Sequence, residues 1–418
     1  MIRADLLVTG LSEVATLAQG PVPRTGPAMS DLGCIANAAI AVDQGRFVFA
    51  GPARVARREV RLRRGGVSWD AEGGSAVPGF VDAHTHVLFA GSRHRETELK
   101  VRGASYSEIA RGGGGLYSTV RATRSASRTE LLDASVARLR RMAAAGTTTA
   151  EVKSGYALNH AGELRLLELV PELARRAGLR LVPTFLGAHA IPPEYAGRSG
   201  TYIAQLVRRT LPIVAARRLA VFCDAFCEPG FFSVAETRRL LEAARRLGLG
   251  TKIHADEFVR SGGAKLAAEL RVTSADHLLA ANTADLKGLA RTGVTAVLLP
   301  VTPFASMARF EGRGRAMVDA GVAVALGSDL SPNSWVESMP IVLAHAVYGA
   351  RLTPAEALTA ATVNSAHALG LSAVAGTIAV GRDADFSVFP VGSSEEIPYR
   401  VGAVPTRVYR QGIRVSLR

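Results

Sequence analysis

The 418-residue sequence predicts an α/β fold, a (β/α)₈ TIM-type barrel with a second small β-sandwich domain that both chain termini form. Two observations predict it. Eight short apolar segments, rich in β-branched residues, alternate with helical runs in the middle of the chain, as expected for βα units around a parallel sheet. Segments with β-like patterns flank this region, and the chain is long enough for a barrel with a companion domain.

The first part of the chain is predicted to be β-rich. Between residues 1 and 77, glycine turns separate three apolar or alternating segments, DLLVTG, AAIAVDQGRFVFAG and VRLRRGGVSWDAEG. Gln44-Gly45 lies where a hairpin turn is expected. Residues 371–418 return to this pattern in AGTIAVGRDADFSVFP and TRVYRQGIRVSLR. We therefore assign 1–77 and 371–418 to the β-sandwich domain and 78–370 to the barrel.

The barrel region offers the eight strands that close a TIM-type barrel. Helical runs such as ELLDASVARLRRMAAAG and VAETRRLLEAARRLG lie between them and end in glycine, as a helix C-cap should. Pro354 stands in the first turn of the helix predicted after the last strand. In chain order the predicted strands are GFVDAHTH, TTTAEVKSG, RLVPTFLGAH, AVFCDAFCE, GTKIHADE, VTSADH, VTAVLLP and VAVALGSD.

The composition indicates a packed globular protein. Hydrophobic residues make up 48% of the chain and charged residues 21%. The net charge of +14 comes from scattered residues that are mostly arginine, and no zinc-finger, RNP-like or helix-turn-helix signal accompanies it, so we expect no nucleic-acid partner. A basic surface would instead favour a small anionic substrate by electrostatic steering.

The cysteines and the N-terminal segment indicate in which cellular compartment the protein is expected. Three cysteines are too few, and odd in number, for a disulfide framework. The start of the chain, MIRADLLVTG, does not have the pattern of a signal peptide, and no apolar run reaches the roughly 20 residues of a membrane span. The expected location is cytoplasmic, without a membrane partner.

Polar residues gather at the predicted ends of the barrel strands. The active site of a (β/α)₈ enzyme lies at the C-terminal ends of its strands. Lysine, glutamate, aspartate and serine residues occur there, together with five of the nine histidines, namely His84, His86, His189, His254 and His277.

Three of these strand ends suggest a metal site. His84 and His86 are two residues apart on one strand, so their imidazoles point to the same side. His254 ends the fifth strand and Asp329 the eighth, and imidazoles with a carboxylate suit a divalent transition metal. Asp329 is also placed to accept a proton from a water whose pKa the metal lowers. The alternative for Asp329 is an N-cap on the following helix.

Three further residues have candidate roles. Glu257 and His277 are predicted to move protons to the leaving nitrogen; the alternatives are a salt bridge for Glu257 and a hydrogen bond to a metal ligand for His277. Arg93, in the loop after the first strand, is placed to bind a carboxylate through two hydrogen bonds, and a solvated loop arginine is the alternative.

These motifs together resemble one family. PGFVDAHTHVLFAGSRHRE, GGGGLYSTVRATR, GTTTAEVKSGYAL, TFLGAHAIPPEY, FCDAFCEPGFF, KIHADE, SADH and LGSDLSP are similar, in this order over about residues 77–370, to the imidazolonepropionases of the amidohydrolase superfamily. The resemblance implies metal-dependent hydrolysis of the ring C–N bond of 4-imidazolone-5-propanoate, in histidine degradation, to N-formimidoyl-L-glutamate by an activated water.

The resemblance also implies residue roles. One Zn²⁺ or Fe²⁺ ion per active site would be held by His84, His86, His254 and Asp329. Glu257 and His277, with Asp329, would activate water and transfer protons. The substrate would be bound by Arg93, Tyr156, His189 and Glu257; of these, Tyr156 is implied by the resemblance alone.

The segment after Asp329 departs from the family pattern. The family typically reads Asp-Phe-Asn-Pro-Gly followed by Ser or Thr, whereas this chain reads Asp-Leu-Ser-Pro-Asn-Ser. Ser331, Asn333 and Ser334 are therefore expected to contact the substrate as polar replacements.

Two alternatives remain open. One is a related amidohydrolase that acts on another heterocycle, such as a purine or pyrimidine deaminase or a cyclic amidase. The other is a non-catalytic, basic nucleic-acid-binding protein, against which ligands at three separate strand ends argue. Because symmetric dimers are the commonest oligomers, a homodimer is the first assembly to test.

Overall fold

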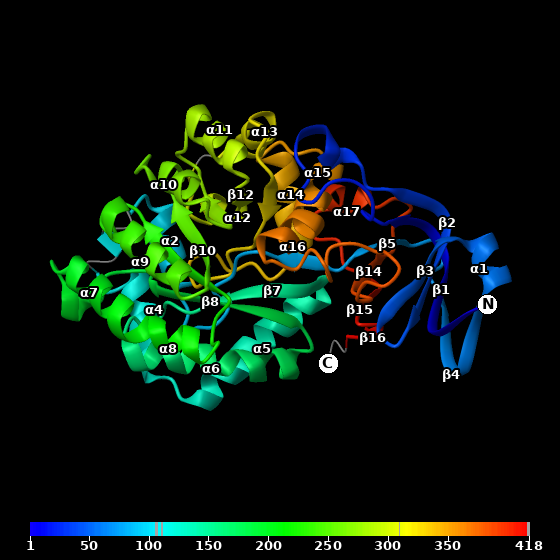
Figure 1. The fold of residues 1–418 in the computed structure, drawn as a ribbon, viewed down its shortest axis with the longest axis horizontal. Helices are drawn as coiled ribbons and strands as arrows, with labels where there is room; N and C mark the ends of the chain where they lie inside the picture. The colour runs from blue at the N-terminus through cyan, green and yellow to red at the C-terminus, as the bar shows by residue number, and fades with distance from the viewer. Residues whose placement is uncertain (105–107, 110–111, 309, 416–418) are drawn as a thin grey trace.

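The computed structural model describes residues 1–104, 108–109, 112–308 and 310–415, and shows a parallel barrel beside a separate mixed sheet (Figure 1). The predicted fold class is confirmed: both ends of the chain contribute strands to the smaller β domain. The strands of this domain belong to one hydrogen-bonded mixed sheet that folds over on itself, so that Phe47 packs against Phe386 with ring centroids 5.7 Å apart.

All eight predicted barrel strands are present, and neighbours in the sequence pair in parallel. The backbone N–H of Asp329 donates to the carbonyl of His84 (3.0 Å) and that of His86 to the carbonyl of Leu330 (2.9 Å), so the last strand end meets the first. The strands are β6 (Phe80–Asp82), β7 (Thr147–Lys153), β8 (Arg180–Ala188), β9 (Phe222–Cys227), β10 (Gly250–Ala255), β11 (Ser274–His277), β12 (Thr295–Leu298) and β13 (Val324–Leu326).

Helices cover the outside of the barrel. Several begin at capping boxes, in which a serine, threonine or asparagine and the residue three positions later exchange hydrogen bonds with each other's backbone. The α-helices are α2 (Glu96–Val101), α4 (Gly115–Ser125), α5 (Arg128–Ala144), α6 (His160–Ala177), α7 (Ser199–Gln205), α8 (Leu211–Ala216), α9 (Val234–Arg246), α10 (Gly263–Leu270), α11 (Thr283–Thr292), α12 (Val301–Ala305), α13 (Arg313–Asp319), α14 (Met339–Tyr348), α15 (Pro354–Thr359) and α16 (Ser365–Ala368).

Short 3₁₀ and π-helical turns complete the helical layer; of the two remaining α-helices, the first packs on the mixed sheet and the second against the last barrel helices. The turns are η1 (Gly26–Ser30), η2 (Pro193–Tyr195), η3 (Leu206–Thr210) and η4 (Ala360–Asn364), and the helices are α1 (Ala53–Glu59) and α17 (Glu396–Tyr399). No helix of the described residues is long and apolar enough to cross a membrane.

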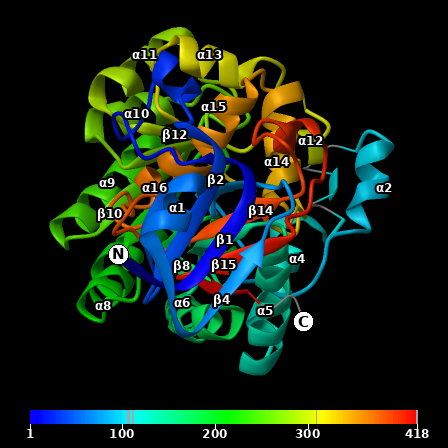
Figure 2. The same cartoon turned by 90° about the vertical axis from the view of Figure 1, so that its right-hand side faces the viewer.

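The mixed sheet joins the two chain ends (Figure 2). The β2–β3 turn at Gln44-Gly45 has positive φ at both residues (49° and 78°), as the tight hairpin turns that match strand twist require. The C-terminal β14 pairs with the N-terminal β5, which pairs in turn with β1. The strands are β1 (Ile2–Ala15), β2 (Cys34–Asp43), β3 (Arg46–Pro52), β4 (Val60–Asp70), β5 (Ser75–Pro78), β14 (Phe386–Phe389), β15 (Arg407–Arg410) and β16 (Ile413–Arg414).

The mixed sheet contacts the barrel at the N-terminal ends of the barrel strands. Phe80 at the start of β6 packs against Phe389 of β14, with ring centroids 5.9 Å apart. Arg180 at the start of β8 forms ion pairs with Asp383 (2.6 Å) and Asp385 (2.7 Å). The C-terminal ends of the barrel strands are therefore left free to form a site on the opposite side.

Candidate active site

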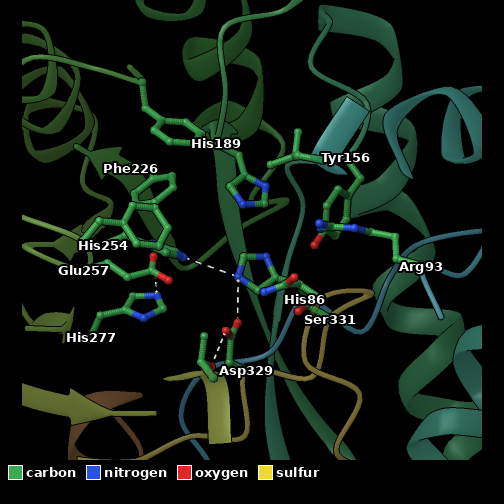
Figure 3. A pocket seen from close by; sticks show the side chains of 15 residues that line it. His86, Arg93, Tyr156, His189, Phe226, His254, Glu257, His277, Asp329 and Ser331 are labelled. Carbon is green, nitrogen blue, oxygen red and sulfur yellow. Dashed lines mark hydrogen bonds and ion pairs between the residues drawn. The ribbon is translucent and has the colours of Figure 1, made fainter. Parts of the chain in front are cut away.

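A pocket opens at the C-terminal ends of the barrel strands (Figure 3). The structure brings ten of the predicted site residues to its walls, from six of the eight strand ends and from the loop after β6. These are His86, Arg93, Tyr156, His189, His254, Glu257, His277, Asp329, Ser331 and Asn333. His84 lies directly beneath the pocket with its imidazole completely buried.

Three imidazoles and one carboxylate converge at the base of the pocket, as Figure 3 shows for His86, His254 and Asp329. Nε2 of His86 lies 3.1 Å from Nε2 of His84 and 3.4 Å from Nε2 of His254. Oδ1 of Asp329 lies 3.5 Å from Nε2 of His84 and 3.4 Å from Nε2 of His86. Ligand atoms about 2.0–2.1 Å from a tetrahedral zinc lie about 3.3 Å apart, so this spacing fits one divalent metal.

The hydrogen bonds of the imidazoles also fit a metal. Nδ1 of His84 lies 2.6 Å from Oδ2 of Asp276, and Nδ1 of His254 lies 3.0 Å from Oδ2 of Asp224. With Nδ1–H of His84 donated to Asp276 and Nδ1 of His254 directed to the Asp224 side, the Nε2 atoms of these imidazoles face one another. Burial, followed by the charges of neighbouring groups, holds the pKa values of His84 and His86 well below the ordinary 6.5, which leaves both imidazoles neutral. Neutral imidazoles with converging lone pairs are the form that binds a cation.

A network of completely buried charged side chains lies under this cluster. Lys153 Nζ contacts Asp224 Oδ2 (2.6 Å), Glu151 Oε2 (2.9 Å) and Asp276 Oδ2 (3.6 Å), and Lys252 Nζ contacts Glu151 Oε1 (2.8 Å). Burial lowers the pKa of Lys153, but the charges of Asp224, Glu151 and Asp276 outweigh this effect and raise it above its ordinary value. Sequence reasoning missed the network, although charged residues inside apolar strands were a visible signal.

Asp329 combines features of a ligand and of a base. Thr302 Oγ1 donates to Oδ2 (2.7 Å), which leaves Oδ1 directed at the imidazoles. Burial raises the pKa of this carboxyl to about 6, against the opposing hydrogen bond from Thr302. The next helix, α14, does not begin until Met339 and has Ser338 at its N-cap, so Asp329 is not a helix cap.

Glu257 and His277 form a pair on one wall of the pocket. Oε2 of Glu257 lies 3.6 Å from Nε2 of His277. Burial, with the charges of Asp329 and Glu228, raises the pKa of Glu257 well above 4.5, so its carboxyl holds a proton more tightly than an exposed glutamate does. Burial lowers the pKa of His277 well below 6.5. The pair thus offers a proton donor beside a neutral imidazole.

The opposite wall carries the predicted substrate-binding side chains. The Arg93 guanidinium donates to Oε2 of Glu96 from Nε (2.9 Å) and Nη2 (2.7 Å), which fixes its orientation. The His189 ring stacks on His86 with centroids 4.8 Å apart, and Tyr156 lies edge-on to His189 at 5.2 Å. Nδ1–H of His189 donates to the carbonyl of Gly155 (3.0 Å), so its Nε2 is the acceptor. Burial, then the charge of His254, lowers the pKa of His189 to about 3.

The segment after Asp329 divides between the pocket and the interior. Ser331 lines the pocket, and its Oγ accepts from the backbone N–H of Ser334 (3.2 Å). Asn333 also lines it and accepts from Lys100 Nζ at Oδ1 (2.8 Å). Ser334 does not line the pocket: its side chain is completely buried. The structure therefore brings two of the three predicted replacements to the site.

An apolar rim, which sequence reasoning missed, completes the pocket. Two of its residues, Phe226 and Phe231, belong to the aromatic-rich segment FCDAFCEPGFF, which was a visible signal for them. The rim consists of Leu116, Phe226, Phe231 and Phe258.

Comparisons with known proteins agree with this geometry. The model of the amidohydrolase family matches residues 75–401. The imidazolonepropionase of Symbiobacterium thermophilum is 47% identical over 99% of this chain and 97% of its own length. That of Chloroflexus aggregans is 42% identical over 99% of this chain and 98% of its own.

Solved structures share the fold at low sequence identity. An adenosine deaminase from Xanthomonas campestris with bound zinc has a TM-score of 0.72 at 19% identity, covering 99% of this chain and 93% of its own. Guanine deaminase from E. coli has a TM-score of 0.69 at 17% identity, covering 99% of both chains. From the family match and the nearly full-length relatives, the chain belongs to the amidohydrolase family and, within it, to the imidazolonepropionases.

Proposed function

We propose that this enzyme hydrolyses the ring C–N bond of 4-imidazolone-5-propanoate and releases N-formimidoyl-L-glutamate. The observation that carries the proposal is the convergence of three imidazole Nε2 atoms and the Asp329 carboxylate at the base of a pocket with an arginine on its wall. The imidazoles and the carboxylate suit metal-assisted hydrolysis of a cyclic amide. The arginine suits binding of an anionic tail. The relatives that match over nearly the whole chain support the same reaction.

We propose one Zn²⁺ or Fe²⁺ ion per active site, held by His84, His86, His254 and Asp329. Imidazole and carboxylate ligands accept both metals. When bound, such a metal supplies a Lewis acid that lowers the pKa of a water towards about 7 and polarises the substrate carbonyl. The protein positions the ligands through Asp276, which accepts from Nδ1 of His84, and through Asp224, which lies 3.0 Å from Nδ1 of His254.

The carboxyl groups of the pocket divide the proton transfers. Asp329, with Oδ1 directed into the site, accepts the proton of the attacking water. The water oxygen bonds to the carbonyl carbon of the ring, and the bond from that carbon to the ring nitrogen breaks. Glu257, whose pKa burial raises, donates a proton to the departing nitrogen, and His277 lies within reach to take part in this transfer.

The contacts that hold the substrate lie away from the bond that reacts. Arg93, oriented by Glu96, binds the propanoate carboxylate, and Tyr156 and His189 contact the ring from the side opposite Glu257. Ser331 and Asn333 add hydrogen-bonding groups along this wall. Because the tail does not react, these contacts govern substrate binding more than the chemical step.

The decisive experiment measures loss of imidazolonepropanoate and metal content on the same sample. We expect hydrolysis to follow the metal, to stop on chelation and to return when Zn²⁺ or Fe²⁺ is added. Guanine, adenosine and cytosine serve as comparison substrates. Ammonia release from one of these, with no turnover of imidazolonepropanoate, would assign the chain to a different amidohydrolase activity.

We further propose a cytoplasmic location, a small anionic heterocycle as the natural ligand, and no nucleic-acid or membrane partner. The described cysteines carry free thiols, which suits a reducing compartment. A homodimer is the proposed assembly, and sedimentation of the metal-loaded enzyme tests it.

A further inference from the structure

The charged network beneath the metal ligands takes no part in the proton transfers described above. It contains three carboxylates and two ammonium groups, all completely buried, from the strands β7, β9, β10 and β11. Burying charges away from water costs several kcal/mol per ion unless each is well paired. Packing alone does not explain why five charged side chains are buried in the middle of the barrel.

The two lysines of the network differ in what they contact. Lys153 Nζ reaches both aspartates that hold the metal-ligating imidazoles, at 2.6 Å for Asp224 and 3.6 Å for Asp276. Lys252 Nζ binds Glu151 (2.8 Å) and the carbonyl oxygen of Ala83 (3.1 Å). Within the described part of the chain, Lys252 lies within 4.0 Å of neither aspartate, although burial raises the pKa of Asp276 and the charge of Lys252, like that of Lys153, lowers it.

The geometry points to Lys153 as a positioning residue for the metal site. Its ammonium group holds Asp224 and Asp276 so that the imidazoles of His254 and His84 direct Nε2 into the pocket. A lysine suits this place because its ammonium group donates a hydrogen bond to Asp224 (2.6 Å) and at the same time keeps a positive charge within 4 Å of Glu151 and Asp276. Without the ammonium group, Asp224 loses a hydrogen-bond donor and Asp276 loses a nearby positive charge, so the imidazole beside each aspartate is free to rotate away from the ligand geometry.

This inference rests on the metal site of the proposed function but not on the identity of the substrate. The test therefore measures metal binding by itself. Metal-free wild type, Lys153→Met and Lys252→Met are titrated with Zn²⁺ against a chelator of known affinity. Lys252→Met is the matched control, since it removes an equally buried ammonium group from the same network.

We expect zinc affinity to fall about 10- to 100-fold in Lys153→Met, the range found when groups that orient metal ligands are removed. The loss in Lys252→Met is expected to be several-fold smaller. The Co²⁺-loaded variants should differ too: the visible absorption bands of Lys153→Met shift from those of wild type, because the ligand geometry has changed, while those of Lys252→Met do not.

A second pair of variants covers the case in which Lys153→Met does not fold. Lys153→Met/Glu151→Gln removes one ammonium group and one carboxylate, so the net charge of the network is kept, and Glu151→Gln alone is its control. The double variant should bind zinc at least tenfold more weakly than Glu151→Gln. Urea unfolding of the metal-free proteins reports whether each variant is folded.

Three results are decisive against these proposals. If the wild-type protein binds neither zinc nor iron, the proposed function is wrong, and so is this inference. If the wild-type protein binds zinc and the folded Lys153 variant binds it equally well, only the role of Lys153 is wrong. Equal losses in Lys153→Met and Lys252→Met also overturn it, since a general disturbance of the network would then explain both.

Discussion

Arg93 is buried on the wall of the pocket, with a guanidinium group that Glu96 already orients. Glu96 also accepts from the backbone N–H of Gly115 (2.8 Å), so the arginine is tied to the start of α4. An arginine fixed in this way is prepared for a carboxylate and does not lose side-chain freedom when the substrate binds. Its contribution should therefore be visible in substrate binding.

Replacing Arg93 tests this directly. Arg93→Ala should raise KM for imidazolonepropanoate by about 10- to 100-fold, the equivalent of one or two hydrogen bonds to a charged group, and leave kcat nearly unchanged. Arg95→Ala is the control, because Arg95 is an exposed arginine two residues away. Steady-state kinetics of both variants measure the effect. A normal KM in Arg93→Ala, or a fall confined to kcat, would contradict the anchoring role.

His189 links the pocket to the pH dependence of stability. The pKa of His189 is about 3 in the folded protein against 6.5 when unperturbed. Below about pH 6.5 the unfolded chain takes up a proton that the folded protein does not, so folding stability falls as the pH drops through this window. At pH 5 this single group costs about 2 kcal/mol.

The metal-free His189→Gln variant should therefore lose about 2 kcal/mol less free energy of unfolding than wild type between pH 7.5 and pH 5.0. Urea unfolding at the two pH values gives the comparison. His94→Gln, which alters an exposed histidine, is the control and should behave as wild type does. If His189→Gln shows the wild-type pH dependence, His189 is not held neutral by its surroundings.

Buried carboxylates hold the segments that leave the barrel strands. Glu228, at the end of β9, accepts from the backbone N–H groups of Glu257 (3.1 Å) and Val259 (2.9 Å), and thereby fixes the segment after β10. Glu163 of α6 accepts in the same way from three backbone N–H groups on either side of Tyr156. These contacts place catalytic and binding side chains that lie outside regular elements.

Glu228→Gln should lower kcat on the order of tenfold with a smaller change in KM. A glutamine has one acceptor oxygen where the glutamate has two, so one of the two backbone N–H groups is released and Glu257 shifts from its position. Glu242→Gln, a partly exposed change on α9, is the control. Steady-state kinetics distinguish the two, and equal kcat values would argue against a role of Glu228 in placing Glu257.

At the scale of the whole molecule, the mixed sheet and the barrel are joined on the side away from the active site. Arg180 reaches from the start of β8 to two aspartates that precede β14, and all three side chains are largely buried. The bottom of a (β/α)₈ barrel generally serves stability and its top serves catalysis. This junction should therefore affect folding without affecting turnover.

Arg180→Met should lower the free energy of unfolding by about 3 kcal/mol, because two carboxylates lose their buried partner, while kcat/KM stays at the wild-type value. Arg176→Met breaks a more exposed ion pair with Asp133 and should cost less than about 1 kcal/mol. Denaturant unfolding and kinetics on the same preparations check both. A large loss of activity in folded Arg180→Met would show that the two faces of the barrel are coupled.

The sequence by itself determined the eight strands, the β-rich ends and the group of histidines at the strand ends. These features depend on neighbours along the chain: alternation and apolar runs report which side of a segment is buried, and a side chain at a strand end points into the mouth of the barrel whatever lies opposite. His84, His86, His254 and Asp329 therefore came together in the structure as their positions in the sequence predicted.

Only the tertiary structure decided which atoms meet across the barrel. Lys153 lies between Asp224 and Asp276 because barrel closure brings three separate strands within one ammonium group's reach, and no pattern along the chain encodes that distance. The same holds for Ser334, which sequence comparison placed at the substrate and the fold buries. The partner of a buried polar group is set by the packing of distant segments, and packing becomes visible only when those segments are assembled.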